Sequence, residues 1–205
     1  MRQHESISQS DACRRALSLF EKVRIPSPER RLDNYPHEMS GGMLQRAMIS
    51  MALACNPKVL LADEPTTALD ATVQIQILLL LRELQREFGL SVIFVTHDIG
   101  VAAEVANRIA LMYAGKIVEE GPTADIIETP RHPYTAGLLG ARAELAHGSD
   151  RLKTIRGAPP DLAHLPAGCA FAPRCDNVSA ICQAKVPAFG SQASGVSVAC
   201  FHPLI

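Results

Sequence analysis

Two short apolar segments that each end in polar residues constrain the fold of this chain most. Residues 59–62 lead directly into Asp63-Glu64-Pro65, and residues 92–95 lead into Thr96-His97. A helical pattern over residues 72–88 lies between them. Short, continuous apolar runs are typical of buried strands in a parallel sheet. The order strand, helix, strand therefore predicts an α/β domain in which helices cover a mostly parallel sheet.

Further elements are expected on both sides of this unit. They are a helix over 10–24 with Ser10 as N-cap, a helix from Ser40-Gly41-Gly42 to Asn56-Pro57, a short helix over 101–106 and a hairpin over 109–119. From about residue 149 the chain is rich in Pro, Gly, Ser and Cys, with little periodicity. This composition predicts a small appended domain with few regular elements.

Charge and hydropathy exclude several classes of protein. The 205 residues carry a formal net charge of −1, so bulk charge does not indicate a nucleic-acid binder. The longest aliphatic run, residues 77–81, is far shorter than the roughly 20 residues that span a bilayer. The start of the chain is polar where a secretory signal needs an apolar core. We therefore expect a cytosolic protein that reaches a membrane only through a partner.

The most informative motif is the heptapeptide from Ser40 to Arg46, which contains Gly41-Gly42 and Gln45. Two glycines before a helix leave backbone N–H groups uncovered, and the helix dipole adds partial positive charge there. Such a site suits a phosphate oxygen, to which the Ser40 hydroxyl can also donate. Taken alone, the stretch is equally well explained as a helix cap with a flexible entry.

Two further candidates lie at strand ends, where open α/β sheets bind ligands. Asp63 is suited to hold Mg²⁺, and Glu64 to orient and polarise an attacking water. His97, at the end of the next strand, is suited to donate a hydrogen bond to a terminal phosphate. The alternatives are an ordinary acidic turn and a structural histidine.

In this order and spacing the motifs resemble the nucleotide-binding subunits of ABC transporters. Residues 40–46 are similar to the signature sequence, with Met43 where many members carry Gln, and residues 60–65 resemble the Walker B strand with its catalytic Glu64. Residues 67–70 resemble the D-loop, which ends at Asp70, and His97 resembles the switch histidine. The resemblance implies ATP with Mg²⁺, held in part by Ser40, Gly41, Gly42, Gln45, Asp63 and Asp70.

Other stretches narrow the resemblance to the oligopeptide/dipeptide importers. They are Tyr35-Pro36-His37-Glu38, Arg131-His132-Pro133-Tyr134-Thr135, and a tail with Cys169, Cys175, Cys182 and Cys200. The resemblance implies a helical-subdomain remnant with the signature helix over 1–56, an α/β ATPase core over 57–147 and a cysteine-containing domain over 148–205. It also implies a second ATPase subunit paired head to tail, two transmembrane permease subunits, a periplasmic or extracellular binding protein, and a peripheral position on the cytoplasmic face of the membrane.

One family motif is missing from the sequence. No G-x-x-x-x-G-K-[ST] phosphate loop occurs, and the only stretch with the glycine spacing, Gly190 to Ser197, has Val196 at the lysine position. Without a phosphate loop, the amides and the lysine that hold phosphate are lacking. We therefore expect that the chain alone does not hold ATP, while its signature can still serve ATP bound by a partner.

The four cysteines of the tail are spaced C-x5-C, C-x6-C and C-x17-C. In a reducing compartment such a cluster indicates a metal site more often than disulfides. The closely spaced pairs typical of zinc sites are absent, and four thiolates also suit a [4Fe–4S] cluster. Relatives with this tail imply the iron–sulfur cluster; the alternatives are zinc, and cysteines that hold no metal or form disulfides.

Three functions are compatible with these observations. The first is an ATP-hydrolysing subunit that energises peptide import and depends on a partner for ATP binding. The second is a fragment that docks on a complete subunit and supplies only its signature. The third is a non-transport ABC ATPase, which the importer-type tail and the lack of basic patches disfavour.

Overall fold

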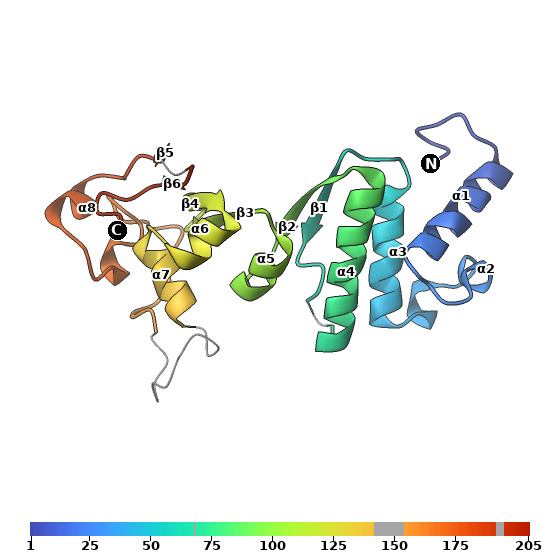
Figure 1. Cartoon of the computed structure of the whole chain (residues 1–205), viewed down its shortest axis with the longest axis horizontal. Coiled ribbons are helices and arrows are strands. Elements are labelled where there is room, and N and C mark those ends of the chain that lie inside the picture. The colour runs from blue at the N-terminus through green and yellow to red at the C-terminus, as the bar shows by residue number, and fades with distance from the viewer. Residues whose placement is uncertain (68, 142–153, 192–194) are drawn as a thin grey trace. The chain divides into compact units, whose positions relative to one another are not determined.

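The computed structural model describes residues 1–67, 69–141, 154–191 and 195–205. These residues form two compact units, Met1–His97 and Asp98–Ile205 (Figure 1). The first contains α1 (Gln9–Lys22), α2 (Pro28–Arg31), η1 (Pro36–Glu38), α3 (Gly41–Leu53), β1 (Val59–Asp63), α4 (Ala71–Phe88) and β2 (Ser91–Val95). The second contains α5 (Ile99–Val105), β3 (Arg108–Tyr113), β4 (Lys116–Pro122), α6 (Thr123–Glu128), α7 (Pro133–Gly140), η3 (Ala172–Arg174), α8 (Ala180–Ala184), β5 (Gly190–Ser191) and β6 (Ser197–Val198).

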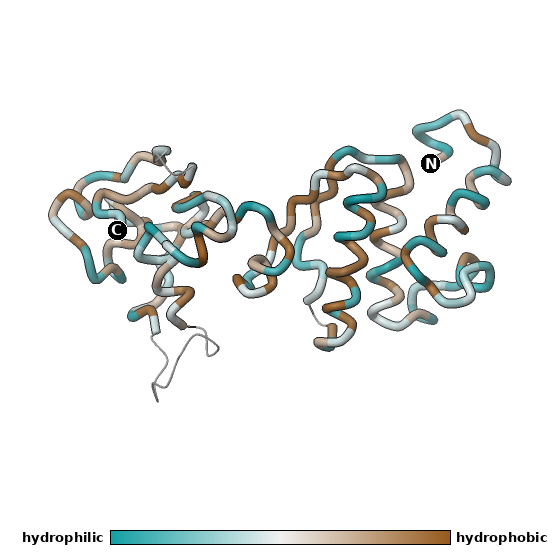
Figure 2. Tube along the Cα trace, viewed as in Figure 1, coloured by the Kyte–Doolittle hydropathy of each residue, from teal (hydrophilic) through white to brown (hydrophobic). Residues whose placement is uncertain are grey.

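The sheet of the first unit consists of β1 and β2, which pair in parallel from Val59 opposite Ser91 to Asp63 opposite Val95. Its covered face packs on α3 and α4 through a core that includes Leu53, Leu60 and Ile77. Figure 2 shows that both strands are mostly hydrophobic. The parallel pairing confirms the predicted strand–helix–strand order.

The other face of this sheet corrects the expectation of buried strands. Val59 and Leu61 of β1 and Ile93 and Val95 of β2 are exposed. β1 therefore alternates between buried and exposed residues although all its side chains before Asp63 are apolar. The reason is that the described helices of this unit form a layer on one face only.

Local capping interactions set the ends of the helices, and two of the predicted helix limits are wrong. α1 begins after Ser8, whose Oγ accepts a hydrogen bond from the N–H of Asp11 at 3.1 Å, and not after Ser10. α3 ends at Leu53, three residues before Asn56. α4 ends as predicted at Gly89, whose φ of 62° is the left-handed conformation that glycine adopts readily.

The second unit contains an antiparallel sheet of four strands in the order β3-β4-β6-β5. β3 and β4 form the predicted hairpin through Ala114 and Gly115, which both have positive φ as a two-residue turn requires. β6 pairs with β4, so part of the tail belongs to the same sheet as the hairpin. The α/β class is confirmed, with sheets of mixed type. The boundaries 1–56, 57–147 and 148–205 remain predictions; the two compact units divide the chain between residues 97 and 98.

The core of the second unit is built around aromatic rings. Phe171 contacts Tyr113 edge to face at 5.2 Å between ring centroids, Tyr134 at 5.6 Å and His132 at 5.8 Å. Glu119 is fully buried beside them, and its carboxylate accepts hydrogen bonds from the backbone N–H groups of Arg131 and His132. Segments on both sides of residues 142–153 thus contribute to one core.

Candidate functional site

The N-terminus of α3 borders a pocket of ≈350 Å³ in the first unit. Ser40 caps this helix, since its Oγ accepts a hydrogen bond from the N–H of Met43 at 3.4 Å. Asp70 caps α4 in the same way, accepting from the N–H of Val73 at 2.9 Å. The pocket is lined by Ser40, Gly41, Gly42, Met43, Arg46, Leu69, Asp70, Val73 and Gln76. Two helix N-termini at one cavity form a setting that favours an anion.

Gly42 allows the two helix starts to approach each other. A Cβ added there would lie 2.9 Å from Cγ1 of Val73, closer than carbon atoms pack without moving. Arg46 adds a positive charge to the same pocket and is held by the carbonyl of Val23 at 2.8 Å and by Oε1 of Gln76 at 3.2 Å. The close approach at Gly42 and the fixed cation are compatible with a phosphate site, and that role stays a prediction.

Glu64 and His97 come together at the carboxyl ends of β1 and β2. Nδ1 of His97 lies 3.0 Å from Oε1 of Glu64. The Thr67 hydroxyl donates to Oε2 of Glu64 at 2.8 Å, so each carboxylate oxygen has its own partner. These two hydrogen bonds, first that of His97 and then that of Thr67, lower the pKa of Glu64. The carboxylate is therefore oriented and ionised, as a group that polarises water must be.

The backbone of Glu64 is in the left-handed region, with a φ of 43°. A non-glycine residue in this region costs on the order of 1 kcal/mol or more, and such residues cluster at functional sites. The N–H of Glu64 donates to the carbonyl of Val95 at 3.0 Å, which fixes the residue just beyond the last pair of the sheet. The hydrogen bond at the junction of the two strands therefore keeps Glu64 in this strained backbone conformation.

The structure brings together some of the predicted residues and not others. Ser40, Gly41, Gly42 and Asp70 share one pocket, and Gln45 is absent from the residues described as lining it. Asp63 is the last residue of β1 and is exposed. Its predicted role as a Mg²⁺ ligand stays a prediction, because no group of three or more His, Cys, Asp or Glu within the described ranges is arranged to hold a metal ion.

Thr67, Arg46 and Gln76 are site residues that sequence reasoning did not single out. Arg46 is one helical turn beyond Gly42, and Thr67 is three residues beyond Glu64, whose carbonyl accepts from the Thr67 N–H at 3.1 Å. The sequence itself shows that Arg46 and Thr67 lie within one turn of predicted site residues, and this signal could have identified them. Gln76 gives no such signal, since its place at the pocket depends on how α4 packs against α3.

The four cysteines of the tail line one small cavity of ≈20 Å³ in the second unit. The N–H of Cys169 donates to the carbonyl of Cys182 at 2.7 Å, and a Cβ at Gly168 would lie only 2.2 Å from that oxygen. Burial raises the pKa of the Cys175 and Cys200 thiols. Cysteines that are up to 31 residues apart (169 to 200) thus border one cavity and all four are free thiols, but within the described ranges they do not form a group arranged to hold a metal ion.

Two family models match the chain. One, described as ABC transporter, matches residues 1–67, and the other, described as oligopeptide/dipeptide transporter, C-terminal region, matches residues 118–182. The first covers the signature helix and Glu64, and the second covers three of the four tail cysteines. No helix in the part of the chain that the structure describes is long and apolar enough to cross a membrane.

Known proteins resemble the chain over most of its length. The oligopeptide transport ATP-binding protein OppD of Bacillus subtilis is 56% identical over 172 residues, which are 83% of this chain and 48% of that protein. The dipeptide transport ATP-binding protein DppD of the same organism is 48% identical over 198 residues, which are 97% of this chain and 59% of that protein. The peptide import ATP-binding protein BMEII0863 of Brucella melitensis is 51% identical over 197 residues, which are 93% of this chain and 58% of that protein.

The chain therefore spans roughly half to three fifths of the length of these curated relatives. Among solved structures, the ATP-binding cassette MJ0796, a dimer in a post-hydrolysis state bound to ADP and phosphate, is similar with a TM-score of 0.50 and 37% identity. That match covers 57% of this chain and 49% of the other. Both family models, the importer relatives and the cassette fold agree, so the chain belongs to the ATP-binding proteins of ABC transporters, in the oligopeptide/dipeptide branch.

Proposed function

We propose that this chain is the signature-bearing part of an ATP-hydrolysing subunit that energises the import of peptides. The observation that carries the proposal is the single pocket formed by Ser40, Gly41, Gly42 and Asp70 at two helix N-termini. The peptide substrate is inferred from OppD and DppD, which are named for oligopeptide and dipeptide transport.

In this mechanism the chain's own residues act at two nucleotide sites of a head-to-tail pair. At the ATP held by the partner's phosphate loop, the amides of Gly41 and Gly42 and the Ser40 hydroxyl close over the terminal phosphate, while Arg46 adds positive charge. At the other site, whose ATP would be anchored by a phosphate loop of the chain's own subunit, Glu64 accepts a hydrogen bond from the attacking water, and His97 holds Glu64 and reaches the terminal phosphate. Asp63 would hold Mg²⁺ through a carboxylate oxygen, and the metal would neutralise charge that develops on the phosphate oxygens.

The remaining parts come from partners. A phosphate loop on another segment or subunit would anchor ATP in a head-to-tail pair, and the cassette that the chain resembles is itself dimeric. Two permease subunits would place the pair on the cytoplasmic face of the membrane, and a periplasmic or extracellular protein would deliver the peptide. These partners follow from the importer branch and are part of the proposal.

A nucleotide titration of the chain by itself tests the dependence on a partner. We expect no measurable binding of MgATP by calorimetry, because these 205 residues contain no phosphate loop. A micromolar dissociation constant that requires Mg²⁺ would refute the dependence.

Hydrolysis is tested in a version fused to the segment of OppD that precedes the matched region. There Glu64→Gln should keep ATP binding and lower turnover about a hundredfold or more, since the group that polarises water is lost. His97→Ala should also slow turnover. The matched control is Glu104→Gln, an exposed carboxylate on α5 that should leave turnover unchanged. Turnover of Glu64→Gln within threefold of the parent would exclude Glu64 as the base.

We also propose that Cys169, Cys175, Cys182 and Cys200 hold a [4Fe–4S] cluster that staples the second unit. Support comes from the four thiols lining one cavity, which is the donor set that such clusters use. A resident cluster would tie together segments that have little regular structure. Protein purified without oxygen should contain about four iron and four sulfide per chain and absorb near ~400 nm.

Single Cys→Ser changes at the four positions should bleach that absorbance, and Cys13→Ser and Cys55→Ser should not. Both control cysteines are exposed and lie in the first unit. One zinc without iron would identify the alternative ion, and the absence of any metal would end the proposal.

A further inference from the structure

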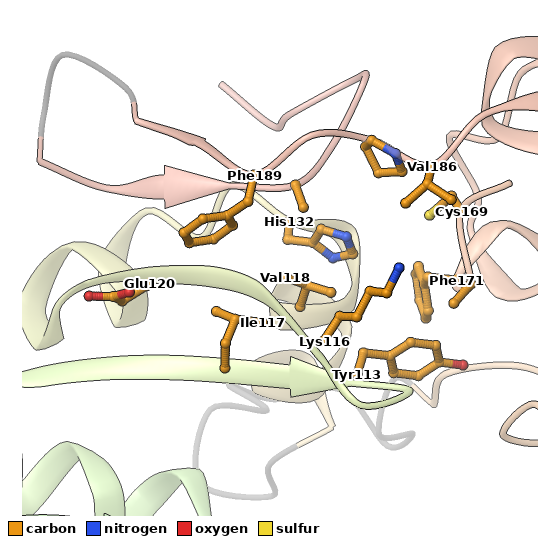
Figure 3. Close-up of a pocket in the computed structure, with 13 residues that line it drawn as sticks. Tyr113, Lys116, Ile117, Val118, Glu120, His132, Cys169, Phe171, Val186 and Phe189 are labelled. Carbon is orange, nitrogen blue, oxygen red and sulfur yellow. The ribbon is translucent and has the colours of Figure 1, made fainter. Parts of the chain in front are cut away.

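The second unit contains a larger pocket, of ≈460 Å³, that the nucleotide chemistry does not use. Its residues come from β3, β4, the segment before α7 and the tail (Figure 3). They include Tyr113, Lys116, Val118, His132, Phe171 and Phe189. This volume is in the range of sites that take a small organic molecule, and such sites are mostly apolar with a few polar groups.

The floor of the pocket is buried and its rim is exposed. Tyr113, Val118 and Phe171 are buried parts of the second core, and the rings of Tyr113 and Phe171 contact each other. Phe189 and Val186, on the rim, are exposed for 46% and 51% of their surface. A ligand would therefore rest on a preformed aromatic surface and cover apolar side chains that now face solvent.

Lys116 supplies the charge of this pocket. Figure 3 shows its side chain extending along the pocket, with the ammonium group between His132 and Phe171. No described residue pairs with Lys116, whereas the acid in the pocket, Glu120, is already paired with Arg108 at 2.9 Å.

His132 does not compete with Lys116 for an anion. It is 2% exposed, and its Nδ1 accepts a hydrogen bond from the N–H of Tyr134 at 3.0 Å. Burial lowers the pKa of His132 to about 4, so the ring is neutral near pH 7. The pocket thus combines aromatic walls with one positive charge that no described acid neutralises.

We propose that this pocket binds a small aromatic or branched carboxylate, whose apolar body lies against Phe171 and Phe189 and whose carboxylate pairs with Lys116. Charge complementarity selects this occupant over a neutral apolar molecule, and the half-open rim admits a ligand of one or two rings. The site shares no residue with the Ser40 pocket or with Glu64 and His97.

The probe for the test is para-fluorophenylpropionate, followed by fluorine NMR on the full chain, with its neutral amide as the matched ligand. A dissociation constant of about 1 mM is expected for so small a carboxylate, with the amide about fivefold weaker or more. Methyl shifts of Ile117, Val118 and Val186 should move during the titration, and those of β1 should not.

Substitutions distinguish the contribution of the Lys116 charge to binding from that of the apolar side chains that line the pocket. Lys116→Met should abolish the preference for the carboxylate, Lys116→Arg should retain it, and Phe189→Ala should weaken both ligands alike. The control is Lys185→Met, an exposed lysine of the same unit that does not line the pocket. The proposal is overturned if Lys116→Met binds the carboxylate as well as the parent does, if the amide binds equally well, or if no saturation occurs by about 10 mM.

Discussion

The sheets of the two units differ in how they distribute apolar residues between their faces. In β1 the buried Leu60 is followed by Leu61, which is equally apolar and 65% exposed. In β3 the buried Ile109, Leu111 and Tyr113 alternate with Arg108, Ala110 and Met112, of which Met112 is a large apolar side chain exposed for 59% of its surface. The second unit therefore closes its core with its own residues, whereas the first has the composition of a sheet made to be covered on both sides.

Loss of an aromatic ring from the closed core should have the largest effect. Phe171→Ala removes a side chain that is 4% exposed and contacts three rings, so we expect the free energy of unfolding of the second unit to fall by about 3–5 kcal/mol. Phe189→Ala, on the pocket rim, should cost less than about 1 kcal/mol. Urea denaturation followed by tyrosine near-UV signals measures both, and equal losses would show that the core is not centred on Phe171.

A pair of leucines tests the two faces of the first sheet. Leu60→Ala should lower stability by about 2–4 kcal/mol, because it opens a cavity against α3 and α4. Leu61→Ala should change it by no more than about 0.5 kcal/mol. Hydrogen exchange of the α4 amides reports on this unit separately. A large loss for Leu61→Ala would mean that the open face is covered in solution.

His132 should make the second unit sensitive to acid. Its pKa is about 4 when folded, below its ordinary value near 6.5, so the unfolded chain binds more protons between these values. Stability is then complete above pH ~6.5 and falls as the pH approaches ~4, by at most about 3 kcal/mol. His132→Asn, which retains a cap acceptor, should lower stability at every pH but remove this slope. An unchanged slope in the variant would assign the acid sensitivity to other groups.

The smallest effect concerns the start of α1. Ser8→Ala should cost about 1 kcal/mol through loss of the bond from the Asp11 N–H, and Ser10→Ala should cost less than about 0.5 kcal/mol. The measurement is exchange of the first α1 amides. If Ser10→Ala has the larger effect, the helix begins where the sequence pattern alone suggested.

Sequence patterns predicted most elements because their signals are local. Gly89 ends α4 by its own backbone preference, and the Ala114-Gly115 turn sets the register of its hairpin. The sequence patterns did not predict the exposed face of β1, because an apolar run does not show whether other elements cover both faces of the strand. Gln76 was missed for a similar reason, because its role depends on Arg46 of another helix, whereas Thr67 lies only three residues from its partner Glu64 and was missed although that spacing is local. The pairing of β6 with β4 depends on chain folding over more than seventy residues, which no spacing rule encodes.

The two-stranded sheet of the first unit has a further consequence for handling the protein. Each of its strands has a single hydrogen-bonded neighbour among the described residues, so both have an open edge next to branched apolar side chains. Open edges of this kind template the addition of further strands from other chains. Self-association should therefore grow with concentration and begin at β1 and β2. A charged residue in place of Leu61 or Ile93 should suppress it without disturbing the helical layer beneath.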